Sequence, residues 1–212
     1  MRIMFDKSIT QIYQIARKEG FDTEQMLQLR TPLTGYRTDN LEIVKYGLDN
    51  GSFSNFNPVA FEKMALKSKG DPLCIWVAMP DVVGDFQSTL ALFHHWQIRL
   101  GISPRKTAFV LQDGVVEDEI PWHDFSCLFL GGTDAFRESS QCWRLLCEAQ
   151  VRHKWVHIGR VNTPTRIVYF YDIADSCDGS GVARFDEMRI KAFRALKELE
   201  GTSQTYLDRE WI

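Results

Sequence analysis

The chain has 212 residues and a formal charge of −3, and 44% of its residues are hydrophobic and 25% charged. This length and composition predict one globular domain spanning residues 1–212, and no apolar run approaches the ~20 residues of a membrane helix. The N-terminus lacks a signal-peptide pattern, and the five cysteines lack the spacing of a disulfide framework. We therefore expect a cytoplasmic protein. The net charge neither indicates nor excludes nucleic-acid binding, for which a local basic patch suffices.

Strand and helix patterns alternate along the chain. Short apolar runs predict strands at residues 2–5, 42–53, 73–81, 107–114, 127–133 and 154–160. Amphipathic or capped segments predict helices at residues 9–18, 58–69, 86–100, 139–152, 164–170 and 185–199. A last strand should grow out of the aromatic run that begins at Tyr169 and should end at two carboxylates, Asp175 and Asp178.

About seven strand–helix alternations favour a parallel sheet closed into a (β/α)8 TIM barrel over an open sheet. The eighth strand is not recognisable. Residues 21–40 show no clear periodicity, and the C-terminal residues 205–212 are a weak candidate. The sequence therefore predicts a barrel that is incomplete or irregularly closed.

Polar or small residues follow successive predicted strands at the point where each strand ends. They are Asp49, Asp81, Gln112, the Gly131-Gly132 pair, and Asp175 with Asp178. Each acid alone is compatible with an ordinary turn, and Asp178-Gly179 is a common turn dipeptide. In a barrel, however, these strand ends converge on one mouth, where active sites lie. Their shared position is what indicates a functional site.

The motifs around these residues have a recognisable order. The series DNGSF, AMPD, VLQDG, LGGT, HIGRVNTP and DSCDGSG resembles that of the tRNA-guanine transglycosylase superfamily, from about Lys45 to Arg184. The zinc site that the tRNA enzymes carry after the last motif is missing here, because no cysteine or histidine follows Cys177. The chain is therefore more similar to the short branch that exchanges guanine in DNA for a 7-deazaguanine, and neither a metal nor another cofactor is implied.

The resemblance implies a catalytic pair. Asp178 would be the nucleophile that attacks C1′ of the target nucleotide and expels guanine, and Asp49 would be the general acid/base. A carboxylate nucleophile and a carboxyl acid/base are what substitution at an anomeric centre requires. We expect the two carboxyl groups to face one pocket, on the order of 5–9 Å apart.

The resemblance also implies binding residues. Asp81 and Gln112, with the backbone of Gly131 and Gly132, would hydrogen-bond the guanine edge. Asn50 would lie near the base, and Asp175 would orient its neighbours. Among the basic residues of the C-terminal segment, Arg184 and Arg189 are candidates for phosphate contacts.

These residues predict a pentosyltransferase with DNA, rather than tRNA, as its nucleic-acid partner. Two alternatives remain open. A nucleoside or sugar hydrolase would use the same carboxylate pair but discharge the intermediate with water. A non-catalytic barrel would bind a nucleobase or nucleic acid without any reaction.

Overall fold

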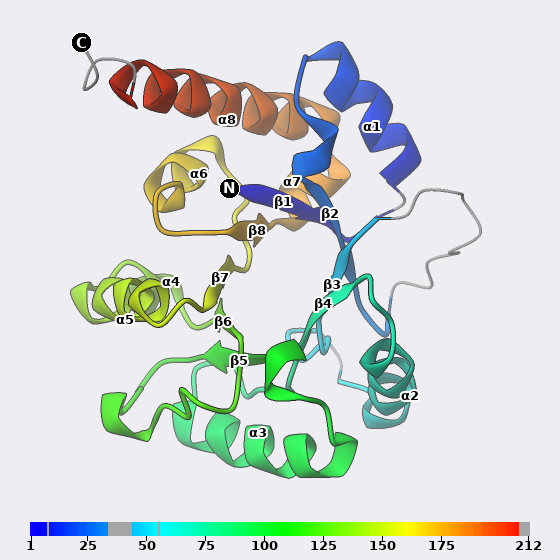
Figure 1. The fold of residues 1–212 in the computed structure, drawn as a ribbon, viewed down its shortest axis with the longest axis vertical. Helices are drawn as coiled ribbons and strands as arrows, with labels where there is room; N and C mark the ends of the chain where they lie inside the picture. The colour runs from blue at the N-terminus through cyan, green and yellow to red at the C-terminus, as the bar shows by residue number, and fades with distance from the viewer. Residues whose placement is uncertain (8, 34–43, 55, 208–212) are drawn as a thin grey trace.

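Eight parallel strands close into a barrel in the computed structural model, which describes residues 1–7, 9–33, 44–54 and 56–207 (Figure 1). Each strand pairs with its neighbour in sequence, and β1 pairs with β8 to complete the ring. The strands are β1 (Arg2–Phe5), β2 (Met26–Arg30), β3 (Tyr46–Leu48), β4 (Cys74–Ala78), β5 (Thr107–Leu111), β6 (Cys127–Leu130), β7 (Trp155–Ile158) and β8 (Ser176–Asp178). The protein is a (β/α)8 barrel, as the alternation of elements predicts.

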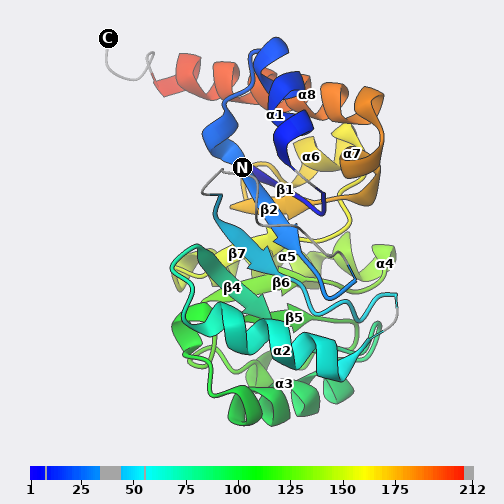
Figure 2. The ribbon, with the colours of Figure 1, turned by 90° about the vertical axis from the view of Figure 1, so that its right-hand side faces the viewer.

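Helices surround the barrel on its outer side (Figures 1 and 2). They are α1 (Ile9–Lys18), α2 (Pro58–Lys69), α3 (Phe86–Leu100), α4 (Asp134–Arg137), α5 (Ser140–Val151), α6 (Pro164–Phe170), α7 (Ser180–Arg184) and α8 (Asp186–Leu207). Short 3-10 turns are η1 (Thr23–Gln25), η2 (Pro104–Lys106) and η3 (Glu117–Glu119). The connection from β5 to β6 contains only the short turn η3, whereas each of the other fully described connections between strands contains at least one α-helix.

Side-chain alternation along the strands divides the apolar residues into two cores. On β5, Ala108 and Val110 point into the barrel, whereas Phe109 and Leu111 pack against the surrounding helices. All five residues of β5 are buried. A parallel strand covered on both faces is expected to be apolar throughout, which explains why such strands are recognisable in the sequence.

A tryptophan fills the barrel interior. Trp76 on β4 is 1% exposed and contacts Phe129 of β6, with ring centroids 5.7 Å apart. Gly47 on the neighbouring strand β3 makes room for it, since a Cβ at that position would overlap the Trp76 indole. A large ring opposite a residue without a side chain is how this interior reaches close packing.

The strand missing from the sequence prediction is β2. Its residues lie in the segment 21–40, which has no clear periodicity, and they pair with β1 and β3. The C-terminal candidate was wrong for the part that is described, because residues 205–207 belong to α8, while 208–212 lie outside the described residues. The barrel is therefore closed by all eight strands and is not incomplete.

Two predicted boundaries also differ. The strand predicted at residues 42–53 is only Tyr46–Leu48 among the described residues. The last strand does not grow directly out of the aromatic run, because α6 continues to Phe170 and β8 begins at Ser176. Asp175 consequently precedes β8, and Asp178 is its final residue. Within the described part of the chain, no helix is long and apolar enough to cross a membrane.

Gly47→Ala should destabilise the protein by about 1–3 kcal/mol, because the added methyl group overpacks the barrel interior against Trp76. Gly70→Ala is the matched control, since a Cβ at Gly70 meets no atom within 4 Å. Its effect should stay within about 0.5 kcal/mol. Urea unfolding of both variants measures the difference, and equal stabilities would contradict the packing described here.

Candidate active site

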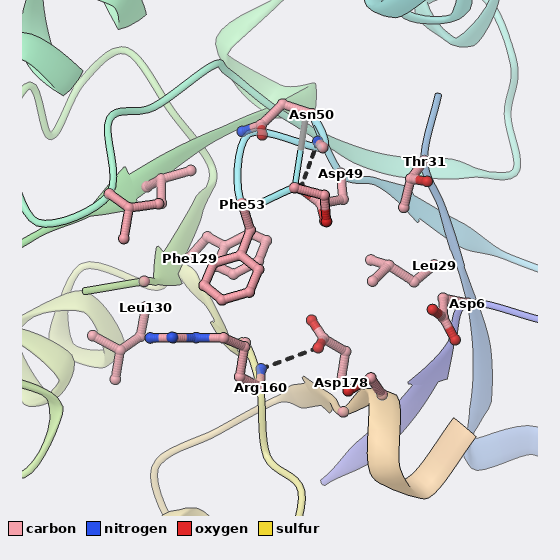
Figure 3. A pocket seen from close by; sticks show the side chains of 18 of the residues that line it. Asp6, Leu29, Thr31, Asp49, Asn50, Phe53, Phe129, Leu130, Arg160 and Asp178 are labelled. Atoms are coloured by element: carbon pink, nitrogen blue, oxygen red, sulfur yellow. Dashed lines mark hydrogen bonds between the residues drawn. The ribbon is translucent and has the colours of Figure 1, made fainter. Parts of the chain in front are cut away.

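One cavity of about 610 Å³ opens at the C-terminal ends of the strands (Figure 3). Every strand contributes to its wall, either with its last residue or with the segment that follows it. The polar contributions, in strand order, are Asp6, Thr31, Asp49, Asp81, Gln112, Gly131, Arg160 and Asp178. Six of the seven residues predicted at strand ends line this cavity, namely Asp49, Asp81, Gln112, Gly131, Gly132 and Asp178. Asn50, which was predicted to lie near the base, lines it as well.

The carboxyl groups of Asp49 and Asp178 point toward one another across the cavity (Figure 3). Asp49 follows β3 and is held by its backbone amide, which donates to the Arg30 carbonyl at 2.8 Å. Burial, then the negative charges of Asp178 and Asp81, raise the pKa of Asp49 to about 7, against a smaller opposing effect of the Gly51 and Asn50 amides. Near neutral pH this carboxyl group can therefore both give and accept a proton, as a general acid/base must.

Asp178 is held at both carboxylate oxygens. Its Oδ1 accepts a hydrogen bond from the backbone amide of Arg160 at 3.0 Å, and its Oδ2 lies 3.2 Å from Nε2 of His157. The side chain is 15% exposed, so it reaches the cavity from a largely buried position. A fixed carboxylate open to a cavity on one side is suited to nucleophilic attack.

Asp81, Asn50 and Gln112 form one hydrogen-bonded group on the cavity wall. Asn50 Nδ2 donates to Asp81 Oδ1 at 2.8 Å, and Gln112 Nε2 donates to Asp81 Oδ2 at 2.7 Å. Gln112 Oε1 accepts the amides of Gly132 and Gly84, each at 2.9 Å. Burial raises the pKa of Asp81, while the hydrogen bonds from Asn50, Ser52 and Gln112 lower it. Both lone pairs of Gln112 Oε1 are thus occupied, but the Asp81 carboxylate oxygens can still accept donors from a ligand.

The glycine pair allows this wall to pack closely. A Cβ on Gly131 would meet the Gln112 side-chain amide, and one on Gly132 would meet Phe136 and Asp113. Gly132 also has φ +74°, which is strained for other residues. Gly131 therefore lets the β6 end lie against Gln112, and Gly132 lets it lie against Phe136 and Asp113.

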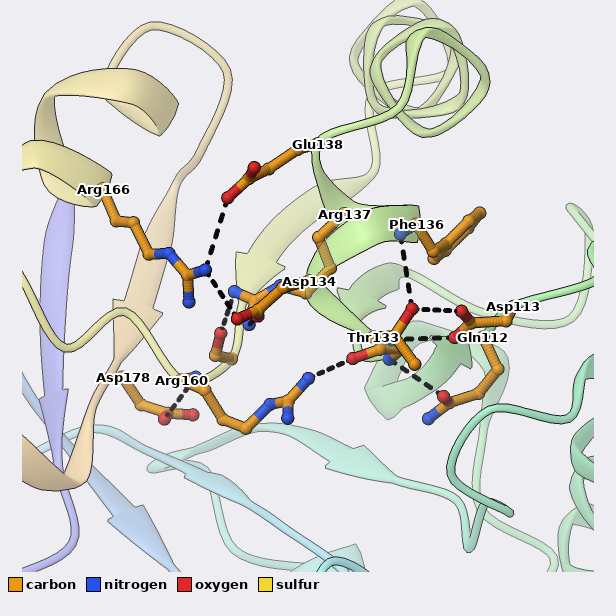
Figure 4. A network of polar contacts seen from close by, with 12 residues as sticks. Gln112, Asp113, Thr133, Asp134, Phe136, Arg137, Glu138, Arg160, Arg166 and Asp178 are labelled. Carbon is orange, nitrogen blue, oxygen red and sulfur yellow. Dashed lines mark hydrogen bonds and ion pairs between the residues drawn. The ribbon is translucent and has the colours of Figure 1, made fainter.

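An aromatic ring and an arginine lie together at the mouth. Phe53 is 65% exposed and lines the cavity, and the Arg160 guanidinium lies 5.0 Å from the centroid of its ring. The same guanidinium donates to the Gly132 carbonyl (Figure 4). It therefore joins the loops after β3, β6 and β7. Arg160 has a positive φ of 56°, an uncommon conformation for this residue.

A second arginine group lies beside it. Arg166 lines the cavity and forms ion pairs with Asp134 at 2.9 Å and Glu138 at 3.3 Å (Figure 4). Arg137 is buried behind them and donates to the Gly159 carbonyl. Burial, then the charges of Arg160 and Arg166, lower the pKa of Arg137 to about 10. This side of the mouth therefore combines the arginines Arg137, Arg160 and Arg166 with the acids Asp134 and Glu138.

Two predicted site residues were wrong. Asp175 lies at the N-terminal end of β8, on the far side of the barrel from the cavity, where it accepts the Val156 amide at 2.7 Å. It was misplaced because β8 starts after it. Arg189 is 4% exposed and donates to the carbonyls of Val182 and Ala183 while pairing with Asp186. Its guanidinium joins α7 to α8 and does not face the solvent. Arg184, in contrast, lines the cavity.

The sequence prediction missed Asp6, which follows β1 and lines the cavity. Burial and the charge of Asp178 raise its pKa, and Arg184 and Lys7 lower it. Its Oδ1 is buried without a hydrogen-bond partner. The same strand-end rule that selected Asp49 selects Asp6 when it is applied to the first strand. Nothing in the sequence indicates the contact of His157 with Asp178.

Several carboxylates thus share the mouth of the barrel, namely Asp6, Asp49, Asp81 and Asp178. Among the residues that the structure describes, no group of three or more histidine, cysteine, aspartate or glutamate side chains has positions that could hold a metal ion. The carboxyl groups at this mouth lie in different environments, which allows them to take different chemical roles.

The fold and the site together define a (β/α)8 barrel with a carboxylate-lined cavity. No family model matches the chain, and no curated protein matches it. Among solved structures, it is similar to phosphoribosyl anthranilate isomerase from Thermus thermophilus, with 15% sequence identity and a TM-score of 0.48, over 94% of this chain and 100% of that chain. The similarity is one of strand and helix arrangement, and it carries no information about the reaction.

Asp49→Asn should increase stability at high pH. The unfolded-state pKa of an aspartate is about 3.9, so the raised pKa of Asp49 favours folding at low pH, and this contribution is lost as the pH rises through about 7. At pH 9 we expect the free energy of unfolding of the variant to be higher than that of the wild type by about 1–2 kcal/mol, after a discount for partial exposure of the side chain. Near pH 4 the two free energies of unfolding should be equal.

Urea unfolding at both pH values measures this difference in stability between variant and wild type. Asp118→Asn, which changes an exposed carboxylate on η3, is the control and should show no such gap. A gap for Asp49→Asn that stays constant between pH 4 and pH 9 would mean that its carboxyl group is not perturbed by burial.

Proposed function

We propose that this protein is a base-exchange transglycosylase that replaces guanine in nucleic acid, with DNA as the preferred substrate, by a 7-deazaguanine. The observation that carries the proposal is the position of Asp49 and Asp178 on opposite sides of one cavity whose wall also holds Asp81 and Gln112. The order of motifs that resembles the tRNA-guanine transglycosylase superfamily independently supports it.

The reaction divides between the two carboxyl groups. An Asp178 oxygen attacks C1′, the glycosidic bond breaks, and the departing guanine takes the proton of Asp49. The incoming base then returns its proton to Asp49 and attacks C1′, which releases the Asp178 carboxylate. The raised pKa of Asp49 suits the acid role, and the hydrogen-bonded Asp178 suits the nucleophilic role.

The wall group offers a complement to a guanine edge. A guanine presents an N–H and an amino group, for which the Asp81 carboxylate is a matched acceptor, and Gln112 can donate to the carbonyl side. Because Asn50 and Gln112 already donate to Asp81, they orient the carboxylate before a base arrives. The exposed ring of Phe53 offers a stacking surface for the base.

A base in a duplex must leave the stack before it can enter this cavity, at a cost of a few kcal/mol. The cationic side chains at the mouth, Arg160 and Arg184, are suited to hold the phosphates on either side of the flipped nucleotide. The same contacts would serve a flipped nucleotide of DNA or of tRNA, so the preference for DNA rests on the likeness to the short, zinc-free branch.

The deciding experiment measures incorporation of labelled guanine into DNA and, in parallel, into tRNA. The expected result is incorporation into DNA, which Asp178→Asn abolishes together with the covalent protein–nucleic-acid adduct. Incorporation into tRNA alone would retain the mechanism and change the substrate. Release of free base without exchange would identify a hydrolase, and binding without either reaction would identify a non-catalytic barrel.

Guanine release in a single turnover should slow as the pH rises above about 7, because Asp49 must carry a proton to protonate the leaving base. Asp49→Asn should lower this rate by roughly 10²–10⁴-fold and remove the decline with pH. A wild-type rate that is flat between pH 6 and pH 9 would remove Asp49 from the acid role.

Asp81→Ala should chiefly reduce discrimination between guanine and adenine, by about 10-fold or more, since the acceptor for the base N–H groups is lost. Asp113→Ala is the matched control, because Asp113 follows the same strand as Gln112 but holds the Thr133 amide at 2.8 Å outside the base-binding wall. Equal discrimination in the Asp81 variant and the wild type would contradict its assignment to base recognition.

A further inference from the structure

A buried histidine lies directly behind the proposed nucleophile. His157 on β7 is fully buried, and its ring packs between those of Trp76 and Phe129, at centroid distances of 4.9 and 4.5 Å. Within the described residues, it does not line the cavity. It therefore cannot contact a substrate, and any effect on the reaction must pass through Asp178.

Both ring nitrogens of this histidine have a hydrogen-bond partner on β8. Its Nε2 lies 3.2 Å from Asp178 Oδ2, and its Nδ1 lies 2.8 Å from Ser176 Oγ. The indole Nε1 of Trp155 donates to the same Ser176 Oγ at 2.7 Å. Ser176 and Asp178 are two residues apart on β8, so both side chains point into the barrel toward β7.

The direction of this chain follows from what each group can do. An indole nitrogen can only donate, so Ser176 Oγ accepts from Trp155 and its own hydroxyl proton is free to be donated to His157 Nδ1. A neutral imidazole carries one proton, which then resides on Nε2 and is donated to Asp178. A protonated ring would also donate from Nε2. In the remaining state, a neutral ring with its proton on Nδ1, Nε2 would carry a lone pair that faces the carboxylate and repels it.

We propose that His157 is the positioning residue of Asp178, oriented by Ser176 and Trp155 so that its Nε2–H donates to Oδ2. This inference rests on the proposed function, because it assigns Asp178 the nucleophilic role. No proton passes through the chain. The histidine holds one carboxylate oxygen while the backbone amide of Arg160 holds the other.

This arrangement assists both half-reactions. Before attack, two donors fix the carboxylate plane, so that its free lone pairs face the cavity. When the incoming base displaces the aspartyl ester, the C1′–O bond breaks and the electron pair returns to the Asp178 carboxylate. Donors already in place stabilise that charge without reorganisation. The low-polarity surroundings of Trp76 and Phe129 strengthen the hydrogen bond.

The position of the His157 proton can be measured without any activity. Long-range 1H–15N spectra of the protein labelled with 15N-histidine distinguish the two ring nitrogens, and His157→Gln assigns the signal among the five histidines. We expect Nε2 of His157 to carry a proton. A neutral ring with its proton on Nδ1 would overturn the proposal, whether or not the protein exchanges guanine.

The catalytic consequence is measured with a pair of variants. His157→Phe keeps the ring in the core but removes the donor, and should lower labelled-guanine exchange by about 100-fold through misplacement of Asp178. His157→Gln can place an N–H near the original Nε2 and should restore exchange to within about 10-fold of the wild type. Equal losses in the two variants, or no loss in His157→Phe, would overturn the positioning role.

Ser176→Ala keeps the test decisive if His157→Phe does not fold. The substitution removes the hydroxyl group that donates to Nδ1 of His157 and so keeps the ring proton on Nε2. The spectra should therefore show a mixture of both proton positions, and labelled-guanine exchange should fall. A spectrum unchanged by Ser176→Ala would contradict the proposed chain. If the wild type exchanges no guanine at all, the proposed function fails, while the spectra still decide the hydrogen-bond chain.

Discussion

Closure of eight parallel strands brings eight chain segments, spread over more than 170 residues, to one rim. Because all the strands run in the same direction, each strand's C-terminal end contributes to the same mouth. Short strands of three to five residues are sufficient, since the two apolar cores inside and outside the barrel hold them in place. The polar side chains at the rim are then concentrated at one mouth and belong to neither apolar core.

That concentration has an electrostatic cost. Burial and mutual repulsion raise the pKa values of Asp6 and Asp49, and burial raises that of Asp81. The structure offsets the cost differently at each acid: side-chain amides donate to Asp81, and a backbone amide and His157 lie against Asp178. Carboxyl groups of one type thus lie in different hydrogen-bonding environments within one cavity, and such differences allow separate chemical roles.

The rim is also organised before any ligand arrives. Gln112 connects Asp81 to the amide of Gly132, and Arg160 connects the Gly132 carbonyl to the loop that carries Phe53. These contacts join the loops after five strands, β3 to β7, into one network, and Figure 4 shows the part of it that involves Gln112 and Arg160. A site whose polar groups orient one another loses less entropy on binding, and a substitution in one loop should therefore affect the positions of the others.

The sequence by itself determined the barrel class and most of the rim. Asp49, Asp81, Gln112 and Asp178 were identifiable because buried parallel strands are apolar throughout, so their ends are visible as local changes in polarity. Where that local contrast is weak, the prediction failed. The strand β2 has the sequence MLQLR and lies beside a segment without clear periodicity. Asp175 lies three residues before Asp178, and no change in polarity shows that β8 begins between them.

Only the tertiary structure decided which side chains meet. Arg189 looks like a solvent-facing helix residue, yet its guanidinium is buried against the carbonyls that end α7. His157 looks like one more polar residue in a strand, yet barrel closure places it against Asp178, 21 residues away in sequence. Such contacts depend on strand order and register across the sheet, and these are long-range properties that no local pattern of polarity encodes.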